Sequence, residues 1–105
     1  IPKVHITRLQ DLSKKETTSL FSTVQKIIGP ILYSSNASAS TIGINDGRNA
    51  GQVVPHIHVH LVPRSEEDGG GNIHSIMCKQ PSTNEKILDN IAKKIQANIL
   101  KENAI

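Results

Sequence analysis

The first strong pattern along the chain predicts an amphipathic helix over about residues 14–32. Ser13 stands three residues before Glu16, the spacing at which the two side chains can cap a helix start reciprocally. Apolar residues then recur every three or four positions, which places them on one face: Leu20, Phe21, Val24, Ile27, Ile28, Ile31 and Leu32. We expect Gly29 and Pro30 to kink this helix or to end it early.

A second helix is predicted near residues 83–101, where apolar positions again recur at helical spacing. Ser82 and Glu85 repeat the capping pattern at its start. Between the helices, an alternating segment at residues 53–62 predicts a strand that ends at Pro63. A shorter strand is expected at residues 41–44. Strands between two helices, without regular β-α-β alternation, favour an α+β domain with an antiparallel sheet.

The connecting segments are small and polar. Residues 45–52 form a glycine-bearing turn, and residues 65–72 are acidic and then glycine-rich, which predicts a loop. A chain of 105 residues has room for one domain, residues 1–105. The chain begins at Ile1 rather than at a methionine, within an apolar stretch that contains Pro2, so we expect the domain to be incomplete at its N-terminus.

Composition excludes several classes of protein. Aliphatic residues supply nearly all of the 36% hydrophobic content, so the core is modest and a shared homodimer interface is physically reasonable. The net charge of +3 comes from scattered lysines without interleaved aromatic residues, which argues against nucleic-acid binding. No apolar run is long enough to cross a membrane. A single cysteine, Cys78, predicts a reducing compartment, and we expect a cytoplasmic protein, with the nucleus as a second location.

Three histidines alternate with aliphatic residues in the predicted strand. Successive side chains of a strand point to opposite faces, so Ile57 and its aliphatic neighbours can enter the core while His56, His58 and His60 share the other face. Same-face positions lie about 6.5 to 7 Å apart. A row of imidazoles on one face carries desolvation and repulsion costs, which points to a function.

Two chemistries fit this row of histidines. In one, the rings bind a zinc ion with an open position, but such a site needs further ligands, for which His5 and His74 are available. In the other, one neutral imidazole is a nucleophile and another donates a proton. The preceding turn favours the second chemistry, because Gly47 and Gly51 allow backbone amides to approach a phosphate closely. We otherwise interpret His5 as a surface histidine and Cys78 as an apolar filler.

Residues 45–64, Asn-Asp-Gly-Arg-Asn-Ala-Gly-Gln-Val-Val-Pro-His-Ile-His-Val-His-Leu-Val-Pro-Arg, resemble the signature of the histidine triad (HIT) family. The Asp-Gly-x-x-Ala-Gly-Gln lead and the Pro-Arg ending are most similar to its fragile-histidine-triad branch, the dinucleoside polyphosphate hydrolases. The resemblance implies an α+β HIT-like fold, a homodimer and an adenine nucleotide substrate. It covers most of residues 1–64, and the family's fourth histidine and most of its nucleoside pocket lie upstream of Ile1.

The resemblance also assigns roles to residues. His58 is the implied nucleophile toward the α-phosphorus, His60 the proton donor to the leaving group, and His56 the residue whose carbonyl orients His58. The implied substrate-binding residues hold phosphate oxygens: Asn45, Gly51, Gln52 and Val53. Val53 stands where many relatives have a hydroxyl residue, so backbone or water must replace that contact.

The expected reaction is hydrolysis of a dinucleoside polyphosphate of the Ap3A or Ap4A type through a nucleotidyl-histidine intermediate. Two alternatives stay open: a nucleoside phosphoramidase, and a nucleotide-binding sensor without turnover. No protein-bound metal or cofactor is required, although a divalent cation, Mg²⁺ or Mn²⁺, can accompany a polyphosphate substrate.

Overall fold

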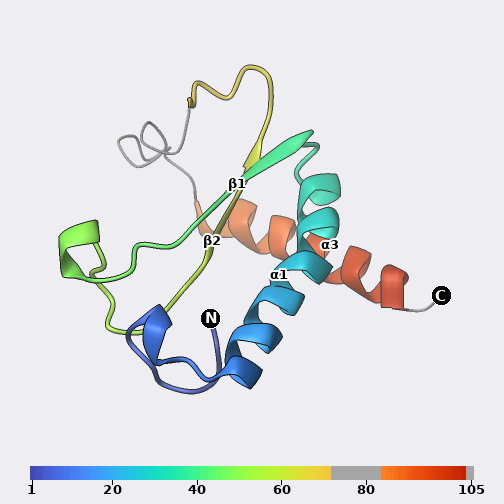
Figure 1. The fold of residues 1–105 in the computed structure, drawn as a ribbon. Helices are drawn as coiled ribbons and strands as arrows, with labels where there is room; N and C mark the ends of the chain where they lie inside the picture. The colour runs from blue at the N-terminus through green and yellow to red at the C-terminus, as the bar shows by residue number, and fades with distance from the viewer. Residues whose placement is uncertain (72–83, 104–105) are drawn as a thin grey trace.

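The chain folds as an α+β unit in which two helices accompany a small antiparallel sheet (Figure 1). This computed structural model describes residues 1–71 and 84–103. Its helices are α1, Lys14–Ser34, and α3, Glu85–Asn103. Its strands are β1, Ala39–Gly43, and β2, His60–Arg64. Two short 3-10 helices, η1 at Leu9–Asp11 and η2 at Arg48–Ala50, lie in the connections.

Helix α1 begins where the capping pattern predicts. The Ser13 hydroxyl accepts the Glu16 N–H at 3.1 Å, and a Glu16 carboxylate oxygen accepts the Ser13 N–H at 3.3 Å. The helix does not end early at Pro30, because it continues to Ser34 with Pro30 buried inside it. Proline lacks the N–H of a regular helical bond, so the helix continues through this position with one backbone bond fewer.

The two strands pair in a register that brings His60 opposite Gly43 and Arg64 opposite Ala39. The predicted strand over residues 53–62 is therefore wrong at both ends, since the paired strand begins at His60 and continues through Pro63 to Arg64. Strand β1 ends at Gly43, so residues before His60 have no partner from β1. The preceding segment is anchored instead by one backbone bond, from Ile57 N–H to the Ile6 carbonyl at 2.8 Å.

The core lies between α1 and the histidine-bearing segment. Ile57 is completely buried, and Leu20 and Val24 of α1 are the other buried hydrophobic residues of the described chain. Val59 and Leu61 line the same apolar hollow as Leu20 and Val24. Val59 and Leu61 therefore face α1, as the pattern predicts, whereas Val53 and Val54 at the start of the segment are exposed.

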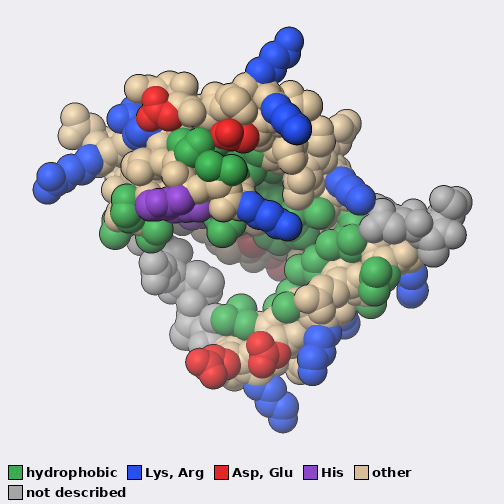
Figure 2. Space-filling view, turned by 90° about the horizontal axis from the view of Figure 1, so that it is seen from below, with side chains coloured by type: hydrophobic (Ala, Val, Ile, Leu, Met, Phe, Trp, Pro, Cys, Tyr) green, Lys and Arg blue, Asp and Glu red, His purple; other side chains and the backbone are tan. Residues whose placement is uncertain are grey.

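Helix α3 packs on α1 and lies behind the sheet in the view of Figure 1. The Asn98 side chain donates to the Ser34 hydroxyl at 2.7 Å. The start of α3 is capped by Asn84, whose side-chain oxygen accepts the Ile87 N–H at 2.9 Å. The predicted cap, Ser82, lies outside the described residues. Figure 2 shows apolar side chains along one side of this helix. Within residues 1–71 and 84–103, no helix is long and apolar enough to span a membrane.

Candidate active site

His58 and His60 form the centre of the candidate site. Their rings lie edge to face with centroids 4.9 Å apart, and both residues are half-buried. The Nδ1 of His58 lies 2.8 Å from the His56 carbonyl oxygen, which is the contact that the resemblance implied. A carbonyl oxygen only accepts, so Nδ1 carries the proton and the neutral ring keeps a lone pair on Nε2. A lone pair on a ring nitrogen is what a nucleophilic imidazole requires.

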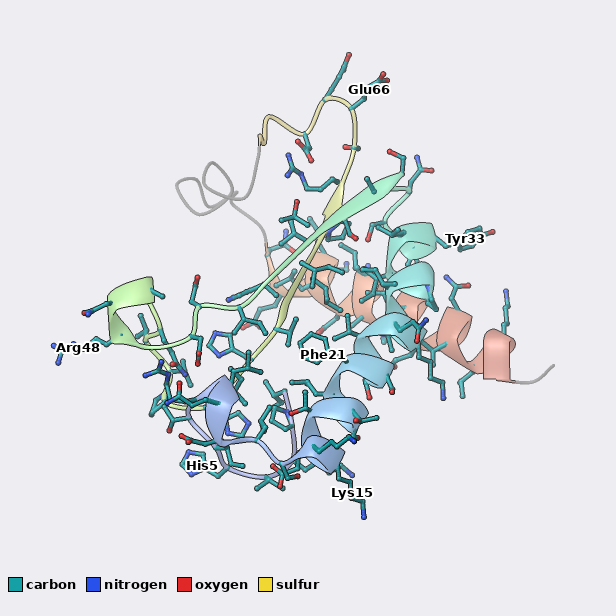
Figure 3. The ribbon with its side chains drawn as sticks, viewed as in Figure 1. His5, Lys15, Phe21, Tyr33, Arg48 and Glu66 are labelled. Atoms are coloured by element: carbon teal, nitrogen blue, oxygen red, sulfur yellow. The ribbon has the colours of Figure 1, made fainter. Side chains whose placement is uncertain are left out.

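The ring of His56 contacts two residues near the start of the chain, His5 and Pro2. It stacks on His5, with centroids 5.4 Å apart, and its Nε2 lies 2.9 Å from the Pro2 carbonyl oxygen. The Nε2 of His5 lies 3.2 Å from the Pro55 carbonyl oxygen. His5, labelled in Figure 3, is exposed, as expected of a surface histidine, and it also contacts the ring of His56. No sequence spacing relates it to His56, because the two are 51 positions apart.

The turn before the histidines is held in a glycine-dependent shape. Gly47 and Gly51 have φ angles of +98° and +94°, in the region that side chains disfavour. Between them, the η2 turn uses the Gly51 N–H to donate to the Arg48 carbonyl at 3.0 Å. The Gln52 N–H also closes the turn by donating to the Gly47 carbonyl at 3.1 Å.

The expected phosphate-binding residues differ in whether their N–H donors are already hydrogen-bonded within the protein. Among the described residues, nothing accepts from the Val53 N–H or from the Asn45 side-chain amide, so both donors remain available. By contrast, the Gly51 N–H is used within η2 and the Gln52 amide is bonded inside the protein. A hollow of about 700 Å³ lies beside this part of the turn, with Val53 and Gly51 in its lining.

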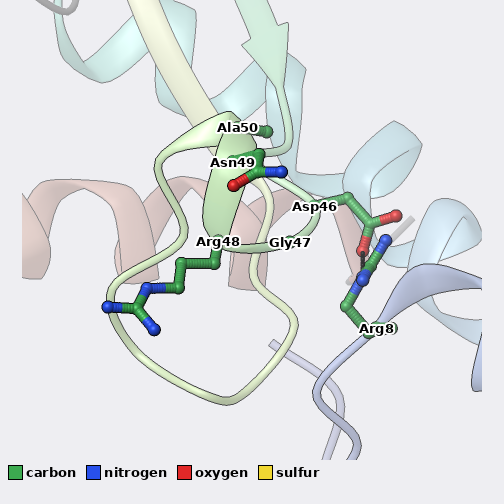
Figure 4. Close-up of a pocket in the computed structure, with 6 residues that line it drawn as sticks. All are labelled: Arg8, Asp46, Gly47, Arg48, Asn49 and Ala50. Atoms are coloured by element: carbon green, nitrogen blue, oxygen red, sulfur yellow. Dashed lines mark hydrogen bonds and ion pairs between the residues drawn. The ribbon is translucent and has the colours of Figure 1, made fainter.

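An ion pair that sequence reasoning missed fixes the start of the turn. Arg8 Nε lies 3.0 Å from an Asp46 carboxylate oxygen, which also accepts the Leu9 N–H at 2.9 Å. These hydrogen bonds hold the pKa of the Asp46 carboxyl below its usual value, with the Leu9 N–H as the larger cause. Figure 4 shows this pair, with Arg48 pointing away from it. Arg8 and Asp46 are 38 positions apart, so no local pattern indicates their contact.

The zinc alternative requires several metal-ligating side chains to lie close together. Within residues 1–71 and 84–103, no three His, Cys, Asp or Glu side chains are grouped closely enough to hold a metal ion. His74, a possible zinc ligand, lies outside the described residues, and so does Cys78, which we interpret as an apolar filler.

Sequence comparisons agree with the geometry. The asymmetrical bis(5'-nucleosyl)-tetraphosphatase of Schizosaccharomyces pombe is 49% identical over 72 residues, which are 69% of this chain and 40% of that protein. The bis(5'-adenosyl)-triphosphatase of Dictyostelium discoideum is 39% identical over 71 residues, 68% of this chain and 48% of that protein. The chain thus matches less than half of the length of either relative.

Solved structures share the fold. A hypothetical histidine triad nucleotide-binding protein from Sulfolobus tokodaii has a TM-score of 0.80 and 25% identity, covering 96% of this chain and 67% of its own. A zinc-bound histidine triad protein from Mycobacterium smegmatis has a TM-score of 0.76 and 26% identity, covering 99% of this chain and 68% of its own. The HIT domain family matches residues 1–67. With its pair of adjacent imidazoles and its glycine turn, the chain belongs to the HIT domain family.

Proposed function

We propose that this protein hydrolyses a dinucleoside polyphosphate at the α-phosphate, with His58 as the nucleophile. The contact between His58 Nδ1 and the His56 carbonyl at 2.8 Å carries the proposal. It fixes the tautomer in which Nε2 has a lone pair, and it also fixes the orientation of the ring. Neither His58 nor His60 is deeply buried, so a phosphate group can reach them.

The reaction has two steps in this proposal. The Nε2 of His58 attacks the α-phosphorus, and the bond from phosphorus to the bridging oxygen breaks with its electron pair on that oxygen. His60, whose ring lies beside that of His58, donates a proton to the departing oxygen. Water then attacks the nucleotidyl-imidazole and gives a proton to His60. This second step releases a nucleoside monophosphate and restores His58.

The phosphate oxygens need hydrogen-bond donors close to the nucleophile. The Val53 N–H and the Asn45 side-chain amide supply them, since neither has a partner among the described residues. Gly51, two residues before Val53, leaves open space, because an added Cβ there would meet nothing within 4 Å. A divalent cation bound by the polyphosphate itself would offset the remaining charge; this is a proposal about the substrate and not about a protein site.

The choice of substrate follows the relatives. The proteins from S. pombe and D. discoideum are described as enzymes that act on dinucleoside tetraphosphates and triphosphates. We extend that substrate class to this chain, with an adenine nucleotide as the first candidate. The homodimer implied by the family also stays a proposal.

The test compares the parent protein with His58→Ala. With diadenosine triphosphate and tetraphosphate as substrates, the parent releases AMP, and His58→Ala lowers turnover by about a factor of 10⁴ or more, because no covalent step is left. Calorimetric titration with AMP is expected to give similar affinities for the two proteins. Lys93→Ala, at an exposed position of α3, is the matched control and keeps parental turnover.

A parent protein that binds AMP without any turnover would overturn the proposal in favour of a nucleotide-binding sensor. Faster release of AMP from a phosphoramidate than from either polyphosphate would reassign the substrate class. His58→Ala with parental turnover would exclude the nucleophile assigned here.

A further inference from the structure

We infer that Gln52 and Asp46 are positioning residues that clamp the glycine turn onto residues 7–9, and that Gln52 acts in this way instead of contacting phosphate. This inference rests on the proposed function, since it concerns how the phosphate-binding turn of that site keeps its shape. It departs from the role that the family resemblance gave to Gln52.

The side-chain amide of Gln52 has no hydrogen-bonding capacity left to give a phosphate. Its Oε1 accepts the Gly47 N–H at 2.8 Å. Its Nε2 donates to the Thr7 carbonyl at 2.8 Å and to the Val54 carbonyl at 3.1 Å. A primary amide has two N–H donors, and phosphate oxygens accept only from donors. Contact with a phosphate would therefore break one of these two bonds.

Asp46 holds the other end of the turn to the same segment. Its carboxylate accepts from Leu9 N–H at 2.9 Å and from Arg8 Nε at 3.0 Å. Gly47, between the two anchors, lies so close to Arg8 that an added Cβ would be 2.9 Å from the guanidinium carbon. Residues 7–9 thus lie directly against the turn, and Gly47 permits this close approach.

The same segment also contacts the histidine-bearing part of the chain. The Thr7 hydroxyl donates to the Pro55 carbonyl at 3.0 Å, and the Ile6 carbonyl accepts the Ile57 N–H at 2.8 Å. The turn and the nucleophile segment therefore share one support. Through that support, the clamp sets the direction of the Val53 N–H relative to His58.

Replacement of Asp46 separates positioning from simple electrostatics. Asp46→Ala removes a negative charge near the proposed phosphate site. If only Coulomb repulsion mattered, its loss would strengthen binding of an anion. If Asp46 is a positioning residue, the same change weakens AMP binding, because the turn loses one anchor. Asp46→Asn keeps an acceptor for the Leu9 N–H but loses the charge that pairs with Arg8, so we expect an intermediate affinity.

The experiment measures AMP affinity by calorimetry for Gln52→Ala, Asp46→Ala, Asp46→Asn and the Gln52→Ala/Asp46→Ala double variant. Each alanine variant is expected to bind AMP about tenfold more weakly, the scale of one lost anchoring interaction. The AMP affinity of the double variant is expected to be within about twofold of that of the single variant that binds AMP more weakly, because both residues act through one turn. Asn49→Ala, at an exposed position in η2 without a side-chain bond among the described residues, keeps parental affinity.

Hydrogen exchange at the Gly47 amide provides a second readout that needs no ligand. The exchange rate is expected to rise in Gln52→Ala and Asp46→Ala but not in Asn49→Ala. Unchanged AMP affinity or stronger binding in Asp46→Ala, or unchanged Gly47 exchange in Gln52→Ala, would overturn the clamp. A parent protein that does not bind AMP would overturn the proposed function, and Gly47 exchange would then still decide on the clamp.

Discussion

Arg64 and Asp68 show how one side-chain pair can organise a loop. Arg64 Nε lies 2.6 Å from Asp68, and another guanidinium nitrogen donates to Thr41 at 3.1 Å and to the Gly71 carbonyl at 2.6 Å. Asp68 also accepts the backbone N–H groups of Gly70 and Ser65. The Arg64 guanidinium, followed by these N–H groups, holds the pKa of the Asp68 carboxyl well below its usual range.

The depressed pKa of Asp68 makes its contribution to stability depend on pH. A carboxyl whose pKa is lower in the folded state stabilises the fold above its unfolded pKa of about 3.9, and this contribution is lost as pH falls toward the folded value. We expect Asp68→Asn to lower the free energy of unfolding at pH 7. The difference from the parent should shrink as pH falls below about 4.

Urea unfolding at pH 7, 5 and 3 measures this difference. Glu67→Gln is the control, because Glu67 is exposed and makes no side-chain bond among the described residues. A deficit in Asp68→Asn that stays constant from pH 7 to pH 3 would show that the loss has a different origin from the charge of Asp68.

At the scale of elements, the capping box of α1 is a local feature whose worth can be measured. Ser13→Ala removes the acceptor for the Glu16 N–H and leaves that donor without its side-chain partner. We expect a loss of about 1 kcal/mol in the free energy of unfolding, the usual effect of removing such a cap. Ser22→Ala, an exposed change within the same helix, should be neutral or slightly stabilising. Equal unfolding midpoints for the two variants would show that the cap contributes nothing.

Local patterns predicted the helices better than the strands. The capping residues and the apolar spacing of α1 lie within one short segment, so its start at Lys14 could be predicted. Alternation correctly identified Ile57, Val59 and Leu61 as the side chains that face the core, but alternation alone cannot say where a partner strand stops. Because β1 ends at Gly43, regular pairing begins only at His60.

The candidate site likewise combines a local contact that the sequence could predict with long-range contacts that it could not. The contact between His58 and the His56 carbonyl spans two positions of the sequence, and the family resemblance implied it. The stacking of His5 on His56 and the bond from Gln52 to the Thr7 carbonyl join residues about half the chain apart. Such contacts depend on how residues 1–9 cross the turn. That path is a tertiary property with no local signal in the sequence.

At the scale of the whole molecule, the core and the candidate site share one segment. Ile57 is completely buried, while its neighbours His56 and His58 belong to the candidate site. With Leu20 and Val24 as the other buried hydrophobic residues of the described chain, much of the apolar contact depends on Ile57. Damage to this core should therefore also affect the geometry of the nucleophile.

Ile57→Ala is expected to cost about 2 to 5 kcal/mol in the free energy of unfolding, and Ile57→Val about 1 kcal/mol. Since domains are typically stable by only about 5 to 15 kcal/mol, the alanine variant should be close to unfolding, whereas the valine variant stays folded. We expect Ile57→Val also to lower turnover of diadenosine triphosphate, because a shifted segment moves the His56 carbonyl relative to His58. Ile42→Ala on β1, where the parent side chain is 43% exposed, is the control for loss of apolar surface away from this segment. If urea unfolding shows Ile57→Ala to be no less stable than Ile42→Ala, the histidine-bearing segment is not the centre of the core, and its geometry must be maintained by the contacts with residues 2–7 alone.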